Sequence, residues 1–264
     1  MKVLIVGIGH LGSWFTEELC LENEVAIYDI DKGKLQHFMN VKRITEFDRI
    51  RDFNPDILLN TVSLQKTIEV FKKILPLIPK NCIISDIASV KIGLKEFYLQ
   101  SGFKFVSSHP MFGPTHPMFR HNFGKERDFS GEFAVIIEES DTKGKEFFKK
   151  IYKKLKINIF EYTFERHDKV MAYTLSIPFT SSMVFASVMK KQDTPGTTFN
   201  RHLDLAKSVL CEDNYLLSEI LFNPHTVRQL ELIGSKLAHL THIIKDKDYD
   251  EMELFIKKLQ KNII

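Results

Sequence analysis

The sequence predicts an α/β protein in which a doubly wound parallel sheet is followed by an all-helical region. Short segments rich in Val, Ile and Leu alternate with amphipathic segments over roughly the first 160 residues. This alternation is typical of parallel strands joined by crossover helices. After about residue 165 the strand patterns stop and only helical periodicity remains. We therefore expect two domains, residues 1–164 and residues 165–264.

Length and composition exclude several classes of protein. The chain has 264 residues, of which 44% are hydrophobic, so it can bury a substantial core. A net charge of +3 is too small to indicate a nucleic-acid partner. The cysteines Cys20, Cys82 and Cys211 are far apart in apolar contexts, which predicts buried thiols and neither disulfides nor a metal site. With no leader and no apolar run near membrane-spanning length, we expect a cytoplasmic protein without a membrane partner.

The first strand ends in a glycine-rich turn. Residues 3–6 are apolar, and Gly7, Gly9 and Gly12 follow in the spacing G-x-G-x-x-G. Such glycines let the backbone turn sharply and approach a ligand, while the next helix, predicted at 13–21, offers its N-terminal N–H groups to a pyrophosphate. A tight structural turn is the alternative interpretation. The residues that we assign to a dinucleotide site in this loop are Gly7, Gly9, His10, Leu11 and Gly12.

The second predicted strand, 24–28, supports that assignment. It ends in Asp29, twenty residues beyond Gly9, where a carboxylate can accept hydrogen bonds from both ribose hydroxyls and repel a 2′-phosphate. Strand, glycine turn, helix and acid in this order indicate a Rossmann-type domain that binds NAD in preference to NADP. Lys32 and Lys34 lie close enough to weaken the preference, and a helix-capping role for Asp29 is the alternative.

The rest of the first domain continues the alternation. Asn54 and Pro55 introduce a third buried strand, and Ser63, which follows its polar end, opens a helix and is assigned to the cofactor site. The further strands are predicted at 56–62, 82–85, 103–107, 132–137 and 158–160. The further helices are predicted at 32–38, 63–75, up to about residue 99, and 143–155.

The second half of the chain shows only helical periodicity. A long helix at 167–190 should be kinked by Pro178 and buried on much of its circumference. Helices at 200–210 and 214–221 follow, then one capped by Asn223 with Pro224 in its first position, and a last one that begins at Asp248 and Glu251. Their apolar stripes predict a homodimer formed through this domain. A self-contained helical bundle is the alternative.

His109 is the best candidate for a catalytic residue. It follows the strand at 103–107, on the side of the sheet where doubly wound proteins bind ligands, and Pro110 restricts the backbone beside it. An imidazole is well suited to accept a proton from a hydroxyl near neutral pH. A histidine bonded to structural carbonyl groups is the alternative. The segment after it, to Gly131, carries a basic set that predicts either a flap over an anion or a solvated loop: His116, Arg120, His121, Lys125 and Arg127.

Four segments, in this order and spacing, resemble the prephenate dehydrogenase family, the prephenate and arogenate dehydrogenases of tyrosine biosynthesis. They are residues 7–12, 86–91, 109–114 and 165–168, and the resemblance covers nearly the whole chain. It implies oxidative decarboxylation of prephenate to 4-hydroxyphenylpyruvate, with NAD as the hydride acceptor. It also implies that His109 interacts with the ring hydroxyl of the substrate, and that Ser89 assists it near the nicotinamide.

The chain departs from the family pattern at the substrate carboxylate. Where better-known members carry an Arg in the helical domain, this sequence has Ser208, so we expect Lys207 or Arg201 to replace it, with the cations of the basic segment before Gly131 as a third option. Thr115 and His167 complete the predicted substrate-binding set. For His167 and its neighbour Asp168, helix capping is the preferred role, with a contribution to the substrate pocket as the second.

Three other functions stay open from the sequence. An arogenate dehydrogenase would differ only in accepting an amino group where prephenate has a keto oxygen. An NAD-binding sensor or dimerisation module would keep the fold without the reaction. A β-hydroxyacid dehydrogenase would rely on a helical-domain lysine, for which Lys169 is the candidate.

Overall fold

The computed structural model describes residues 1–112 and 129–263. The chain divides into two compact units, Met1–Met171 and Ala172–Ile264. The division falls within helix α5 (Phe164–Thr174) and not at its start, where the sequence predicted it. The beginning of α5 stays with the first unit because Phe164 is part of a hydrophobic core on the sheet.

One eight-stranded sheet organises the first unit. The strand order is β3-β2-β1-β4-β5-β6-β7-β8, with the change of winding direction between β1 and β4. The strands are β1 (Lys2–Val6), β2 (Glu24–Tyr28), β3 (Lys42–Arg43), β4 (Ile57–Asn60), β5 (Ile83–Asp86), β6 (Phe105–Pro110), β7 (Phe133–Ile137) and β8 (Asn158–Tyr162). The expected doubly wound fold is confirmed.

Two details of the sheet differ from the prediction. β7 runs antiparallel to β6, whereas every other described pair is parallel. The residue pattern of a buried strand does not encode its direction, which depends on the route of the connection. The short edge strand β3 was also not predicted, because two exposed residues carry no periodicity.

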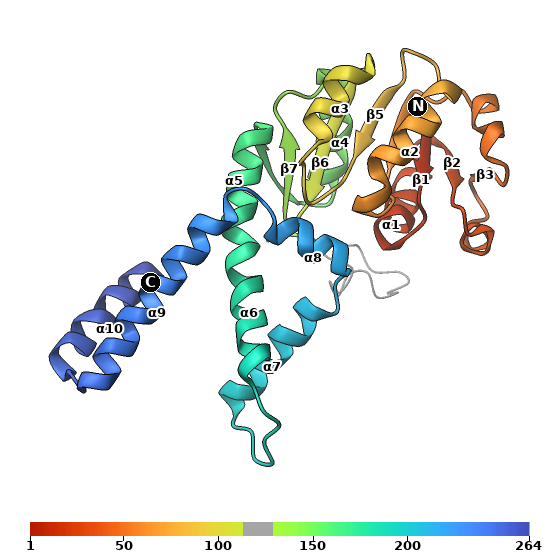
Figure 1. The fold of residues 1–264 in the computed structure, drawn as a ribbon. Coiled ribbons are helices and arrows are strands. Elements are labelled where there is room, and N and C mark those ends of the chain that lie inside the picture. Colours follow the sequence, from red (N-terminus) through yellow and green to blue (C-terminus); the bar gives the residue numbers. More distant parts are fainter. Residues whose placement is uncertain (113–128, 264) are drawn as a thin grey trace. The chain divides into compact units, whose positions relative to one another are not determined.

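Helices cover both faces of the sheet (Figure 1). α1 (His10–Leu19) and α4 (Thr142–Lys154) contribute to one hydrophobic core, while α2 (Thr67–Ile74) and α3 (Leu94–Ser101) contribute to the other. β1 supplies alternate side chains to the two cores, Val3 and Ile5 to the first and Leu4 and Val6 to the second. This two-sided burial explains its unbroken apolar sequence. Short 3-10 helices complete the unit: η1 (Lys32–His37), η2 (Phe47–Asp52), η3 (Leu64–Lys66) and η4 (Leu75–Leu77).

The described part of the second unit is helical. Its helices are α6 (Ser176–Val188), α7 (Thr197–Leu210), α8 (Asn214–Leu221), α9 (Thr226–Asp246) and α10 (Tyr249–Ile263). α6 packs against α7, α8 and α9, and α9 packs against α10. A buried hydrogen bond of 2.7 Å joins the hydroxyl groups of Ser176 and Thr226 and so ties α6 to α9.

The long helix predicted at 167–190 is two helices. The break between α5 and α6 is at Leu175, three residues before Pro178. Proline has no N–H to donate and its ring crowds the carbonyl group four residues earlier, so the regular helix is interrupted on that side. The expectation of extensive burial is wrong for α6, where Ser176 is the one fully buried residue and Val188 is 71% exposed. The helices described around it cover only part of its surface.

Helix starts in the second unit follow the predicted caps in one case and not in the other. The Asp248 carboxylate accepts a hydrogen bond of 2.9 Å from the Glu251 N–H at the start of α10, as predicted. The Asn223 side chain accepts from the His225 N–H at 3.0 Å, and α9 begins only at Thr226. Asn223 therefore closes the turn that precedes α9 and does not cap the helix itself.

Two expectations from composition are also corrected. Within the described residues one stretch, Phe164–Val188, is long and apolar enough to span a membrane by length and composition alone. The prediction found no such stretch because serine and threonine interrupt its apolar runs. The structure divides this stretch into α5 and α6 at Leu175, and the cytoplasmic location stays a prediction. All three cysteines are free, but only Cys82 is buried, while Cys20 is half-buried and Cys211 is exposed at the end of α7.

Candidate active site

The glycines between β1 and α1 make room for close backbone packing. Gly7 has a φ of +93°, and a Cβ there would lie 2.7 Å from the side chain of Val62. A Cβ on Gly12 would lie 2.0 Å from the Gly7 carbonyl oxygen. A Cβ on Gly9, which precedes the first turn of α1, would meet nothing within 4 Å. Gly7 and Gly12 thus shape the turn, and Gly9 leaves open space at the helix N-terminus for a ligand.

Asp29 fixes the end of β2 to this loop. Its Oδ2 accepts a hydrogen bond of 2.6 Å from the Ile8 N–H, and its Oδ1 accepts one of 2.8 Å from the Asp31 N–H. Lys34 Nζ lies 3.7 Å from the same Oδ2. A carboxylate has about four lone-pair positions, so each oxygen can still accept a ribose hydroxyl.

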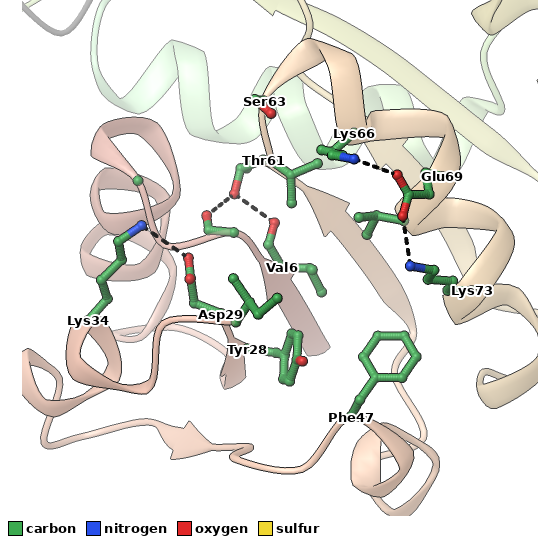
Figure 2. A pocket seen from close by; sticks show the side chains of 15 residues that line it. Val6, Tyr28, Asp29, Lys34, Phe47, Thr61, Ser63, Lys66, Glu69 and Lys73 are labelled. Atoms are coloured by element: carbon green, nitrogen blue, oxygen red, sulfur yellow. Dashed lines mark hydrogen bonds and ion pairs between the residues drawn. The ribbon is translucent and has the colours of Figure 1, made fainter.

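A cavity of about 700 Å³ opens between the glycine loop, the end of β2 and the start of α2 (Figure 2). Of the predicted cofactor-binding residues, Gly7, Gly9, Asp29 and Ser63 line it. His10, Leu11 and Gly12 are not among its lining residues. Its full lining is Val6, Gly7, Gly9, Tyr28, Asp29, Ile30, Lys34, Phe47, Thr61, Val62, Ser63, Lys66, Glu69, Val70 and Lys73.

Thr61 is a residue of this cavity that the sequence argument missed. Its hydroxyl contacts two backbone carbonyl oxygens of the glycine turn, that of Gly7 at 2.5 Å and that of Val6 at 3.1 Å. Figure 2 shows these bonds beside Asp29. The sequence signal that could have identified Thr61 is the polar end of the strand predicted at 56–62. Thr61 therefore stabilises the glycine turn, next to the open space at Gly9.

The far wall of the cavity carries a small cluster of charges. Glu69 accepts hydrogen bonds from Lys66 Nζ at 2.9 Å and from Lys73 Nζ at 2.7 Å. These ammonium groups lower the pKa of Glu69 to about 2. The cavity therefore has ionised groups on this wall and the aromatic rings of Tyr28 and Phe47 at its base (Figure 2). An open helix N-terminus, a buried acid at the end of β2 and apolar walls fit the adenosine half of a dinucleotide.

His109 lies at the carboxyl end of β6 and is only 6% exposed. Its Nδ1 is 3.1 Å from Nε2 of His167, and the two rings meet edge to face. Burial is the main cause that lowers the pKa of His109 well below the usual histidine value, and His167 and Lys91 act in the same direction. The histidine is therefore neutral at neutral pH, with one ring nitrogen unprotonated.

His167 and Asp168 do not have the capping role preferred from sequence. α5 begins at Phe164, whose N–H donates to the Glu139 carboxylate, while Thr163 Oγ1 accepts from the Arg166 N–H at 3.1 Å. His167 lies within α5, beyond its first three residues, and its side chain is fully buried. The sequence could not reveal the contact between the His109 and His167 rings, because the two residues are 58 positions apart and meet only in the fold.

A buried lysine in the loop after β5 connects that loop to β6 at Ser108, the residue before His109. Lys91 Nζ is 2.6 Å from Asp86 Oδ2 and donates to the Ser108 carbonyl oxygen at 2.6 Å. The other carboxylate oxygen of Asp86 accepts from the Tyr98 hydroxyl at 2.6 Å. Burial lowers the pKa of Lys91, and Asp86 opposes that effect.

The same lysine restrains the loop that carries Ser89. This loop follows β5, which pairs with β6 in the register Asp86 to Ser107, so Ser89 and His109 both lie just beyond the level of that pair. Ser89 is half-buried. The predicted catalytic pair therefore comes from adjacent strand ends.

The remaining predicted residues lie elsewhere. Arg201 and Lys207 are exposed on α7 in the second unit, where Lys207 pairs with Asp204 at 3.5 Å, and their carboxylate-binding role stays a prediction. Thr115 and the whole basic set of the predicted flap fall in 113–128, outside the described residues. In the described residues no three His, Cys, Asp or Glu side chains are grouped to hold a metal ion.

Comparison with known proteins shows to which family the chain belongs. Residues 15–158, more than half of the chain, match the model of the prephenate dehydrogenase nucleotide-binding domain. The chain belongs to the prephenate dehydrogenase family. The matched residues include Asp29, Ser63 and His109 but not the glycine turn at residues 7–12.

The relatives carry two substrate names. The chain is 23% identical to a probable arogenate/prephenate dehydrogenase of Methanocaldococcus jannaschii, over 98% of this chain and 60% of the relative. It is 26% identical to the chloroplastic arogenate dehydrogenase 1 of Arabidopsis thaliana, over 88% of this chain and 38% of the relative. The chain thus spans less than two thirds of the length of either relative.

Solved structures share the fold. The structure of prephenate dehydrogenase from A. aeolicus, in complex with hydroxyphenyl propionate and NAD+, superposes with a TM-score of 0.82 at 19% identity and covers 99% of this chain and 96% of that one. A Synechocystis arogenate dehydrogenase gives a TM-score of 0.73 at 16% identity over 99% of this chain and 98% of that one. At these identities the likeness shows a shared fold alone.

Proposed function

We propose that this protein is an NAD-dependent dehydrogenase that converts prephenate to 4-hydroxyphenylpyruvate by oxidative decarboxylation, in tyrosine biosynthesis. The observation that carries the proposal is the placement of a buried, neutral His109 at the carboxyl edge of the same parallel sheet that forms the dinucleotide cavity. Family membership supports the substrate class.

The first unit offers the residues that would hold NAD. The N–H groups at the start of α1, where Gly9 leaves open space, would bind the pyrophosphate, and Asp29 would accept hydrogen bonds from the adenosine ribose. Ser63 and the apolar lining of the cavity would contact the adenosine. Bound there, NAD supplies the hydride acceptor of the reaction.

The chain's own contribution to the chemistry is proton transfer at the ring hydroxyl. When the carbon that bears this hydroxyl is oxidised, its oxygen becomes carbonyl-like and the O–H proton acidic, so His109 accepts that proton. Departure of the ring carboxylate as carbon dioxide then makes the ring aromatic, and the oxygen takes the proton back to become the phenol. We place Ser89 beside His109 in this step, and Lys207 or Arg201 at a substrate carboxylate.

His109→Asn tests this assignment. Asparagine keeps polarity but cannot take up a proton, so kcat should fall by about 10²-fold to 10⁴-fold, the usual contribution of a general base, while NAD affinity stays close to that of the wild type. NADH formation from prephenate measures the first quantity and calorimetric titration with NAD the second. His37→Asn, at an exposed position of the same unit, is the matched control. Unchanged turnover in His109→Asn would remove His109 from the mechanism.

Arogenate is the second candidate substrate, favoured by the names of the relatives. Because arogenate differs from prephenate only in the side chain, the proton transfer at His109 would be the same. Parallel measurement of kcat/KM on the two substrates separates the two functions.

Two functions of other classes have weaker support. Stoichiometric NAD binding without turnover of either substrate would identify a non-catalytic sensor. A β-hydroxyacid dehydrogenase would need Lys169 as a functional group, but Lys169 forms an ion pair of 2.5 Å with Glu165 on the same helix and is half exposed. We also propose that the enzyme is a homodimer through its helical unit and acts in the cytoplasm.

A further inference from the structure

We propose that His167, itself oriented by Asp168, is a positioning residue that fixes the tautomer of His109 so that Nε2 is the proton-accepting atom. The inference rests on the proposed function for its catalytic consequence, but the tautomer is a property of this chain alone. The observation that carries it is a row of three side chains, Asp168, His167 and His109, in which each ring uses one nitrogen toward the next group.

The direction of the hydrogen bonds follows from the end of the row. Asp168 Oδ1 lies 3.3 Å from His167 Nδ1, and an ionised carboxylate can only accept. The proton is therefore on Nδ1 of His167, which leaves Nε2 of this neutral ring as an acceptor. That atom is 3.1 Å from Nδ1 of His109, so Nδ1 of His109 must carry the hydrogen. The remaining nitrogen of His109, Nε2, then holds a free lone pair.

Both histidines are neutral in this arrangement because of their surroundings. His167 is fully buried and His109 is nearly so, and burial is the largest cause that lowers the pKa of each ring. Lys91, on the loop after β5, lowers both values further. Asp168 on α5 and Asp86 at the end of β5 raise the pKa of His167 without overcoming its burial.

Within the described residues, Nε2 of His109 has no hydrogen-bond partner, whereas Nδ1 is committed to His167. An isolated histidine in water more often carries its proton on Nε2, and in that form it presents a donor to a substrate hydroxyl. The hydrogen bonds from Asp168 through His167 reverse this tautomer preference in His109. When His109 accepts a proton, its Nδ1–H continues to donate to His167, so the cation forms without a rearrangement of hydrogen bonds.

The tautomer can be read directly by nuclear magnetic resonance. In the protein labelled with 15N at histidine, long-range 1H–15N correlation separates protonated from unprotonated ring nitrogens, and loss of one signal set in His109→Asn assigns the ring. We expect an unprotonated Nε2 and a protonated Nδ1 in the wild type near neutral pH. The opposite pattern would overturn the proposal, whether or not the protein turns over prephenate.

Two substitutions separate positioning from simple structural support. His167→Leu fills similar space without an acceptor, so His109 should revert to the Nε2-protonated form and kcat should fall by about 10²-fold. His167→Gln can place an amide oxygen near the lost Nε2, so it should restore the wild-type tautomer and most of the turnover. Lys169→Gln, on the exposed side of the same helix, is the control and should change neither.

The pH profile gives the last readout. In wild type, kcat/KM should fall only when the pH drops below the lowered pKa of His109, and His167→Leu should lower the plateau itself. A His167→Leu protein that keeps the Nδ1-protonated His109 and wild-type kcat would overturn the proposal. If His167→Leu does not fold, the tautomer of His109 in the wild type and in His167→Gln decides: an Nε2-protonated His109 in the wild type overturns the proposal. If the tautomer is as proposed but neither prephenate nor arogenate is oxidised, the proposed function fails and the positioning inference stands.

Discussion

At the scale of single residues, the site is built from groups whose protonation is set by burial. His109 and His167 are buried as neutral rings in contact with each other, and Lys91 lies close enough to disfavour a positive charge on either. Asp29, at the end of β2, accepts hydrogen bonds from two backbone N–H groups. The sequence predicted His109 and Asp29 as site residues from their positions at strand ends, but the burial that lowers the pKa of the histidine depends on α5, which is distant in sequence.

This burial predicts a pH-dependent stability of the first unit. A histidine with a lowered pKa in the folded state binds fewer protons than in the unfolded chain, so its stabilising effect is complete above the unfolded pKa and is lost as the pH falls below it. Between about pH 6.5 and the lowered values, each of the two rings should reduce the free energy of unfolding by up to about 1.4 kcal/mol per pH unit. Urea unfolding at several pH values measures the slope.

Trp14, the single tryptophan, is buried in the first unit, and its fluorescence reports on that unit. His109→Asn should show a shallower slope because only His167 remains to be charged. An equal slope in this variant and in wild type would indicate that other groups dominate the acid response.

At the scale of elements, one buried lysine connects two neighbouring strand ends. Lys91 bridges Asp86 at the end of β5 and the Ser108 carbonyl oxygen in β6, and it lies in the segment that carries Ser89. The sequence placed 86–91 in a family motif without a role for this lysine. Its function in the fold is visible only because β5 and β6 pair side by side.

Lys91→Met should therefore be strongly destabilising. The substitution leaves the Asp86 carboxylate buried without its positive partner, and breaking a buried pair in this way costs about 3–5 kcal/mol. We expect a large drop in the urea midpoint followed by Trp14 fluorescence. Lys104→Met, which removes an exposed partner of Asp141 in the same unit, should stay near the wild-type midpoint. A midpoint for Lys91→Met equal to that control would contradict a structural role for the buried pair.

At the scale of the whole molecule, the helical unit exposes many apolar side chains. On α9 and α10 these include Leu232, Leu237, Ile244, Leu254, Ile256 and Ile263. Exposed apolar surface of this extent is typical of an interface, and a second copy of the chain is the occupant that we propose.

Leu237→Glu tests the homodimer. Leu237 is 58% exposed on α9, and in a two-fold symmetric interface the change would act twice, so the dissociation constant of the dimer should rise about 10-fold or more. Light scattering over a range of concentrations measures it. Ser235→Glu introduces the same charge at another exposed position of α9 and should have little effect. A wild-type protein that is monomeric at all concentrations would rule out the dimer.

The sequence alone determined the class of fold and the nucleotide-binding end of the site. Local patterns suffice there, because β1, the glycine turn, α1 and Asp29 lie within the first 29 residues and each is required by the backbone geometry of the others. Only the tertiary structure decided the direction of β7, the exposure of α6 and the environment of His109. These features depend on which distant segments meet, and a residue pattern records the burial of a side chain without recording its partner.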